Sequence, residues 1–163
     1  MQTIELIQIG ANGIPLGYAG KLNVVVRQVC AATAELYRAT GFAPPWVGYL
    51  ACVDKHLVGA CAFKAPPADG KVEIGYLTFP DFEGQGVASL MVDQLLDMVR
   101  TKNPSLTVFA QTENEENASN AILKKFGFQF VGVINDAEGG ELWQWQWTNA
   151  KQSQKQSPST SHV

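Results

Sequence analysis

The sequence is short of cysteine and histidine and has no cluster of them that suggests a metal site. Of its 163 residues, three are cysteine and two are histidine, and the cysteines, Cys30, Cys52 and Cys61, form no Cys-x-x-Cys pair. An odd number of separated cysteines gives little support to disulfide bonds or to a zinc site. We therefore expect buried free thiols and no bound metal.

Long apolar runs and blocks of basic residues are also missing. No apolar run reaches the length that spans a membrane, and the stretch from Met1 to Gly10 lacks the positive and apolar regions of a secretory signal. The Lys and Arg residues are scattered along a chain with a formal charge of −3, so the basic footprint of a nucleic-acid-binding protein is absent. These absences predict a cytoplasmic protein that binds neither membranes nor nucleic acids.

What is present is the composition of an ordinary folded domain. Hydrophobic residues make up 46% and charged residues 17% of the chain, which is usual for a globular protein. Residues 149–163 are rich in Gln, Ser and Lys and hold hardly any apolar side chain, so burial cannot offset their ordering entropy. We predict a single domain over residues 1–148 and a disordered polar tail over residues 149–163.

One glycine-containing stretch, Asp81 to Ser89, lies between an apolar strand over Lys71 to Phe79 and an amphipathic helix. Apolar residues repeat at helical spacing after it, so the helix should begin within Gln85 to Ala88. Gly84 and Gly86 can take positive φ, and the first amides of the helix would point into the loop. The stretch predicts an anion site, and a plain strand-to-helix turn is the alternative.

The other segments alternate between strand and helix patterns. Before the loop we expect a strand over Thr3 to Ile9, a helix between Lys21 and Thr40, and a hairpin of Trp46 to Val53 with Leu57 to Phe63. After the central helix we expect a strand over Leu106 to Ala110, a helix over residues 118–126, and strands over Phe128 to Ile134 and Glu141 to Trp147. A strand, a crossover helix and a second strand imply one parallel pair in the sheet.

Two helix ends and two buried faces can also be predicted. Gly41 and Gly127 suit the C-terminal ends of the first and last helices, and the first helix should bury the face that carries Val25, Val29 and Tyr37. The tryptophans of the last strand alternate with polar residues and share one face: Trp143, Trp145 and Trp147. We expect them to form an aromatic layer over the core, with a ligand platform as the alternative.

Four motifs in the second half of the chain carry a resemblance to a known family. They are Val72-Glu73-Ile74-Gly75-Tyr76-Leu77, the stretch from Pro80 to Ser89, Asn117-Ala118-Ser119, and the stretch from Leu123 to Phe128. Together they resemble the GCN5-related N-acetyltransferase (GNAT) superfamily, and within it the branch that includes ribosomal-protein N-terminal acetyltransferases. The resemblance implies the α/β (α+β) GNAT fold: a mixed central sheet of about seven strands with splayed middle strands and flanking helices. The loop has no P-loop lysine, so a P-loop nucleotide-binding protein fits poorly. It also lacks the GxGxxG spacing of a dinucleotide-binding fold.

The resemblance further implies an acetyl-CoA-dependent N-acetyltransferase that acetylates a primary amine of a peptide N-terminus or a small molecule by direct attack. In the family the pyrophosphate of acetyl-coenzyme A lies on the loop amides, which agrees with the physics of helix N-termini, and the pantetheine arm lies along the preceding strand. The implied cofactor-binding residues are Leu77, Thr78, Phe79, Gly84, Gln85, Gly86, Val87, Ala88, Ser89 and Asn117.

Amine acetylation also needs a base, because an alkylammonium is protonated near neutral pH and cannot attack. Glu73 matches a position where this branch often carries Glu and is the expected base, with a solvated carboxylate as the alternative. Ser119 matches the serine of the branch and could contact the leaving thiolate, with a helix N-cap as the alternative. The acceptor pocket is expected to involve Tyr37, Phe42 and Trp46.

Three positions depart from the family pattern. Glu83 stands where Gln or Arg is usual, Glu116 stands where Asn is common, and Leu123 replaces the tyrosine that serves as general acid in many members. Glu83 and Leu123 motivate an alternative function, a non-catalytic module that binds coenzyme A or acyl-CoA as a sensor. A protein-interaction domain that uses the tryptophan face is a third hypothesis, and the oligomeric state, monomer or homodimer, is left open.

Overall fold

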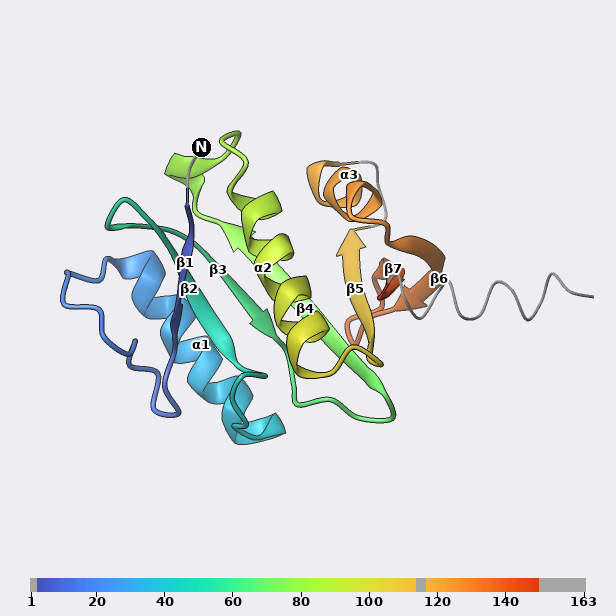
Figure 1. Cartoon of the computed structure of the whole chain (residues 1–163), viewed down its shortest axis with the longest axis horizontal. Coiled ribbons are helices and arrows are strands. Elements are labelled where there is room, and N and C mark those ends of the chain that lie inside the picture. The colour runs from blue at the N-terminus through green and yellow to red at the C-terminus, as the bar shows by residue number, and fades with distance from the viewer. Residues whose placement is uncertain (1–2, 114–116, 150–163) are drawn as a thin grey trace, which may run out of the picture. The chain divides into compact units, whose positions relative to one another are not determined.

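The computed structural model describes residues 3–113 and 117–149, and Figure 1 shows the arrangement of their elements. In chain order these are β1 (Glu5–Gln8), α1 (Val24–Thr40), β2 (Gly48–Val53), β3 (His56–Phe63), β4 (Lys71–Thr78), a short 3-10 helix η1 (Pro80–Phe82), α2 (Val87–Lys102), β5 (Thr107–Glu113), α3 (Ala118–Lys125), β6 (Gln129–Asn135) and β7 (Glu141–Thr148). Each expected strand and helix is present, and the ends differ by a few residues. Residues 150–163 of the predicted tail lie outside the described residues, and Asn149, with which that prediction starts, is buried.

The described strands form a mixed seven-stranded sheet in the order β1-β2-β3-β4-β5-β7-β6. Neighbours are antiparallel except for β4 and β5, which are parallel as predicted. The parallel pairing joins Lys71–Glu73 to Thr107–Phe109, whereas β4 pairs with β3 through Ile74–Thr78. This is the mixed sheet that the GNAT resemblance implies.

The chain divides into two compact units, which we describe one at a time. The first holds residues 1–66 and 74–95, and the second holds residues 67–73 and 96–163. The first unit therefore contains β1 to β3, α1, η1, most of β4 and the start of α2. The second contains the beginning of β4, the end of α2, and β5, α3, β6 and β7. The single domain over residues 1–148 stays a prediction.

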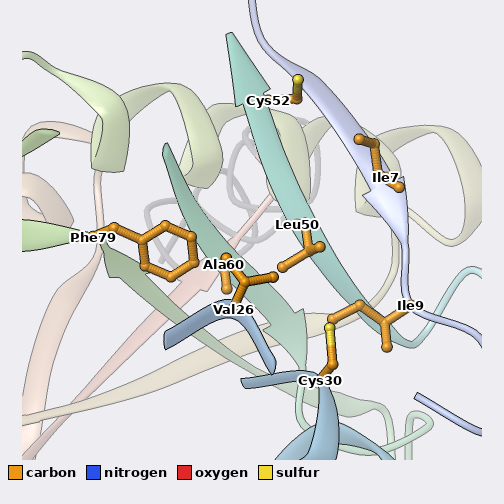
Figure 2. Close-up of a cluster of buried hydrophobic side chains, with 8 residues drawn as sticks. All are labelled: Ile7, Ile9, Val26, Cys30, Leu50, Cys52, Ala60 and Phe79. Carbon is orange, nitrogen blue, oxygen red and sulfur yellow. The ribbon is translucent and has the colours of Figure 1, made fainter. Parts of the chain in front are cut away.

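The core of the first unit is a cluster of buried side chains from α1, from β1 to β3 and from the residues directly after β1 and β4, drawn in Figure 2. Its members are Ile7, Ile9, Val26, Cys30, Leu50, Cys52, Ala60 and Phe79. The predicted buried face of α1 was wrong by one position at its start, since Val25 is 39% exposed and Val26 is 1% exposed. The face that packs on the core is instead a stripe of residues three or four positions apart, which are Val26, Cys30, Ala34 and Tyr37. The side-chain oxygen of Asn23 caps the helix by accepting from the Val26 amide at 2.9 Å.

The helix ends and the hairpin follow the predicted chemistry. Gly41 ends α1 with φ 102°, and Gly127 follows α3 with φ 92°, both in the left-handed region that favours glycine. The hairpin between β2 and β3 turns through Asp54 and Lys55, which have φ 49° and 67°. A two-residue turn with positive φ at both positions matches the twist of the flanking strands.

The core of the second unit includes the expected aromatic layer. Trp145 and Trp147 are 3% and 6% exposed, and Phe128 lies beside Trp147 with ring centroids 6.4 Å apart. The guanidinium of Arg100, from the end of α2, lies 5.2 Å from the centre of the Trp147 ring, a favourable cation–π distance. The last strand therefore uses its tryptophans for packing.

The three cysteines are free and buried, as predicted. None of the helices within the described ranges is long and apolar enough to cross a membrane.

Candidate functional site

The loop between β4 and α2, in the first unit, has the backbone shape of an anion cradle. Glu83 is extended, and Gly84 and Gly86 have φ 79° and 81°, values that side-chain-bearing residues rarely adopt. The helix α2 then begins at Val87, inside the predicted range. A Cβ on either glycine would have no atom within 4 Å, so the loop borders open space rather than packed side chains.

The amides of this loop are available to a ligand. Among the described residues, those of Gly84, Gln85 and Gly86 donate no backbone hydrogen bond, and all three residues are exposed. The first turn of the following 16-residue helix carries no acidic side chain, so its positive dipole end is not neutralised from within the helix. Exposed amides at such a helix start suit a phosphate or diphosphate. Asp81 and Glu83, the two carboxylates between β4 and the glycines, are both exposed.

The strand that leads into the loop has two unlike faces. Val72 and Ile74 are 2% and 1% exposed, whereas Leu77 is 51% exposed. Glu73 and Leu77, four residues apart, point to the same face of β4 because side chains alternate along a strand. Glu73 is half-buried and makes an interaction within the protein. Phe79 is buried in the core of the first unit, so only its backbone is available to a ligand.

Two glycines, Gly59 in β3 and Gly75 in β4, allow other atoms to approach β4 closely. A Cβ on Gly59 of β3 would lie 2.6 Å from the carbonyl oxygen of Leu77, and a Cβ on Gly75 would lie 2.7 Å from Cε of Lys64. Gly59 therefore allows the close approach of β3 to the Leu77 backbone, and the Lys64 side chain covers Gly75. The contact of Lys64 with Gly75 was not predicted from the sequence, because no motif around Lys64 indicates it.

In the second unit, Asn117 begins α3 as its N-cap. Its side-chain oxygen accepts from the amide of Asn120 at 3.1 Å. The alternative interpretation of Ser119 as the cap is therefore wrong, because Ser119 is the second residue of the helix. Ser119 is half-buried and has a partner within the protein. The side-chain amide of Asn117 retains its N–H donors.

A buried hydrogen-bond chain, which sequence analysis also missed, links α3 to β5 and β7. Trp145 Nε1 donates to Thr112 Oγ1 at 3.0 Å, and Thr112 Oγ1 donates to Asn120 Oδ1. The predicted strand ended at Ala110, but the alternation of buried residues along β5 continues through Thr112. In the sequence, the signal for the longer strand was Thr112, a β-branched residue two positions after Ala110.

The predicted acceptor residues lie in the first unit and differ in their surroundings. Tyr37 is buried, and its hydroxyl donates to the Ile9 carbonyl at 2.8 Å and accepts from the Gly48 amide at 2.9 Å, which gives it a structural role. Burial raises its pKa. Phe42 is 39% exposed and packs edge-on against Tyr37, and Trp46 is half-buried. Contact of these residues with an acceptor stays a prediction.

The site residues predicted from the sequence therefore fall into two groups. The first unit contains the phosphate loop, the Leu77–Phe79 segment and the three acceptor residues, and the second contains Glu73, Asn117 and Ser119. Leu123, at the position of the family's tyrosine, is 0% exposed, so it belongs to the core. Among the described residues, no cluster of His, Cys, Asp and Glu could hold a metal ion.

Several solved structures share this fold at low sequence identity. RimL, a ribosomal L7/L12 alpha-N-protein acetyltransferase in complex with coenzyme A, is 19% identical with a TM-score of 0.66, over 90% of this chain and 94% of that one. RimJ of Mycobacterium smegmatis in complex with CoA-disulfide is 20% identical with a TM-score of 0.61, over 77% and 61% of the two chains. The microcin C7 self-immunity acetyltransferase MccE, in complex with acetyl-CoA and AMP, is 15% identical with a TM-score of 0.61, over 78% and 72%.

Sequence comparison gives the family directly. No curated protein sequence matches the chain. The profile of the acetyltransferase (GNAT) domain, however, matches residues 25–129, which run from the start of α1 through the phosphate loop and α3 to the first residue of β6. A match over more than half of the chain, on the fold described above, shows that the protein belongs to the GNAT acetyltransferase family.

Proposed function

We propose that this acetyl-CoA-dependent enzyme acetylates a primary amine, either the N-terminus of a peptide or an amino group of a small molecule. The observation that carries the proposal is the open glycine loop at the start of α2, whose exposed amides suit a diphosphate. The similar structures include an alpha-N-protein acetyltransferase, a name that supports a peptide N-terminus as the acceptor.

The residues present fit acetyl-coenzyme A. The amides of Gly84 to Ala88 and the hydroxyl of Ser89 would hold the pyrophosphate, because the two glycines open the loop to solvent. The backbone of Leu77 to Phe79 and the side-chain amide of Asn117 would hold the pantetheine arm. When bound, acetyl-coenzyme A supplies an activated acetyl thioester.

Two side chains of this chain would serve the reaction. Glu73, on the less buried face of β4, would take the proton that the ammonium group must lose before it can attack. Ser119, in the first turn of α3, would donate a hydrogen bond to the leaving sulfur. Leu123 is apolar and buried, so a tyrosine acid at that position has no counterpart here.

A thiol-release assay on the full chain tests the proposal. The amine panel should contain peptides with free N-termini, the same peptides N-acetylated, and small primary amines. We expect release with a free amine and none with the blocked peptides. Glu73→Gln should lower kcat by about 100-fold or more, as loss of a general base does, while the Kd for coenzyme A measured by calorimetry stays the same. Glu5→Gln, an exposed carboxylate on β1, is the matched control.

The same experiment separates the enzyme from a sensor of acyl-CoA. Coenzyme A binding without release for any amine, together with no effect of Glu73→Gln, would favour the sensor, which the exposed Glu83 beside the loop motivates.

A further inference from the structure

The first unit holds a pocket to which we have assigned no part in acetyl transfer. Its volume is about 450 Å³, and it is lined by the start of α1 and the segment before it, the turn between β2 and β3, and η1. Sites for small molecules commonly have volumes of about 300 to 1,000 Å³. Asp81 and Phe82, at the start of the stretch Asp81 to Ser89, line this pocket, and none of the residues from Glu83 to Ser89 does. The pocket therefore borders the phosphate loop without including its glycines.

Five apolar side chains that line the pocket are buried or half-buried, and we call them its floor. The five polar lining residues are exposed, and we call them its rim. Val26 belongs to the buried cluster of Figure 2, and the other four apolar lining residues pack against that cluster. These four are Tyr18, Leu22, Leu57 and Phe82. Side chains fixed by a packed core lose little freedom when a ligand binds, so a preformed floor reduces the entropic cost of binding. Two of the five are aromatic, which favours a flat ring as the ligand body.

The rim of the pocket carries more positive than negative charge. Lys21 and Lys55 lie on it, and Asp81 is its one carboxylate. Neither lysine forms an ion pair with any residue in the described ranges. This local excess of ammonium groups contrasts with the net charge of −3 of the whole chain.

The backbone and one amide side chain place further donors at this rim. Lys55 is held in a tight turn with φ 67°, and its neighbour His56 also lines the pocket. The side-chain oxygen of Asn23 accepts from the Val26 amide at 2.9 Å, so the NH₂ group of Asn23 remains as a donor. Ammonium and amide donors around an apolar floor match an anionic group attached to a ring.

We propose that this pocket binds a small aromatic molecule that carries one anionic group, a phosphate or a carboxylate, independently of acetyl-coenzyme A. The ring lies on the floor next to Tyr18 and Phe82, and the anion lies at the rim near Lys21 and Lys55. This site goes beyond the proposed acetyl transfer and does not depend on it, since binding is measured without turnover.

Amide chemical shifts of the full chain test the proposal, with phenyl phosphate as the probe and benzyl alcohol as its neutral counterpart. We expect phenyl phosphate to cause saturable shifts in the pocket segments, which are residues 18–26, 55–57 and 81–82. Benzyl alcohol should bind more weakly, because it lacks the charge. Lys21→Gln with Lys55→Gln should raise the Kd for phenyl phosphate by about tenfold or more, as expected for loss of charge-assisted hydrogen bonds.

A second double variant controls for the change in net charge. Lys71→Gln with Lys102→Gln changes the net charge equally at exposed lysines outside the pocket and should leave the Kd unchanged. The proposal is overturned by shifts that do not saturate, by shifts confined to residues 83–89, by an equal effect of the two double variants, or by loss of phenyl phosphate binding when coenzyme A is saturating. The same spectra report whether each variant is folded.

Discussion

The indole N–H of Trp145 donates a hydrogen bond to the hydroxyl of Thr112 at 3.0 Å, deep in the second unit. The same hydroxyl donates a hydrogen bond to the side-chain oxygen of Asn120. One hydroxyl is therefore the hydrogen-bond partner of a residue in β7 and of a residue in α3. Thr112→Val keeps the shape and removes that hydroxyl. We expect a loss of about 2 kcal/mol in the free energy of unfolding, because a buried donor and a buried acceptor lose their partner.

Urea unfolding measures this loss. Thr107→Val is the control on the same strand, since the Thr107 side chain is only half-buried and makes no side-chain hydrogen bond within the described residues. Equal losses for the two variants would mean that the Thr112 hydroxyl contributes nothing specific.

Stability at high pH should depend on Tyr49. Burial raises its pKa from 10.0 to about 12, and its hydroxyl donates to the Pro45 carbonyl at 2.7 Å. Between those pH values the unfolded chain loses the phenol proton and the folded chain keeps it, so stability falls as pH rises. A shift of this size corresponds to a loss of about 2 kcal/mol between pH 10 and pH 12.

Comparison with Tyr49→Phe isolates this contribution. The variant should be less stable than the natural chain near neutral pH, because it lacks the hydrogen bond to Pro45, but its stability should fall less steeply between pH 10 and 12. The buried thiols titrate in both proteins and cancel in the difference. Parallel stability curves over that pH range would contradict the assignment.

The phosphate loop can be tested with two glycines of the same conformation. Gly86 and Gly17 have φ 81° and 80°, and neither would place a Cβ within 4 Å of another atom. Both Gly→Ala variants should therefore lose a similar free energy of unfolding, about 1 to 2 kcal/mol, from backbone strain alone. Only Gly86→Ala should raise the Kd for coenzyme A, by about tenfold. Calorimetry that finds the same Kd for both variants would remove the loop from the binding site.

A second pair of glycines tests how closely β3 must approach β4. Gly59→Ala would place a methyl group 2.6 Å from the backbone oxygen of Leu77, whereas Gly75→Ala would meet the flexible end of Lys64 at 2.7 Å. A backbone cannot move aside as a lysine can, so we expect a loss of about 1 to 3 kcal/mol for Gly59→Ala and a much smaller one for Gly75→Ala. Thermal unfolding of both variants measures the difference, and a larger loss at Gly75 would refute the argument.

Short-range sequence patterns correctly predicted the helices and strands and the conformation of the glycine loop before α2. The start of α2 at Val87 followed from the glycines and from helical spacing, and Gly41 and Gly127 end their helices as expected. The phase of α1 could not be predicted from three adjacent valines of equal hydrophobicity, because packing against the rest of the core decides which of them is buried.

The features that sequence analysis missed depend on residues far apart in the chain. Thr112 and Trp145 are 33 positions apart and meet only because β5 pairs with β7. The pocket near Lys21 and Lys55 likewise needs α1, a hairpin turn and η1 to come together. The roles of Glu73 and Ser119 came from family resemblance and stay predictions.

The buried thiols of Cys30, Cys52 and Cys61 have a practical consequence. Burial raises the pKa of each, and the protonated thiol is a poor nucleophile. The folded chain should therefore resist alkylating reagents and exchange with coenzyme A disulfides, and each sulfur should react only when its surroundings open. Iodoacetamide labelling of these natural probes would then report local opening of the first unit, without any engineered tag.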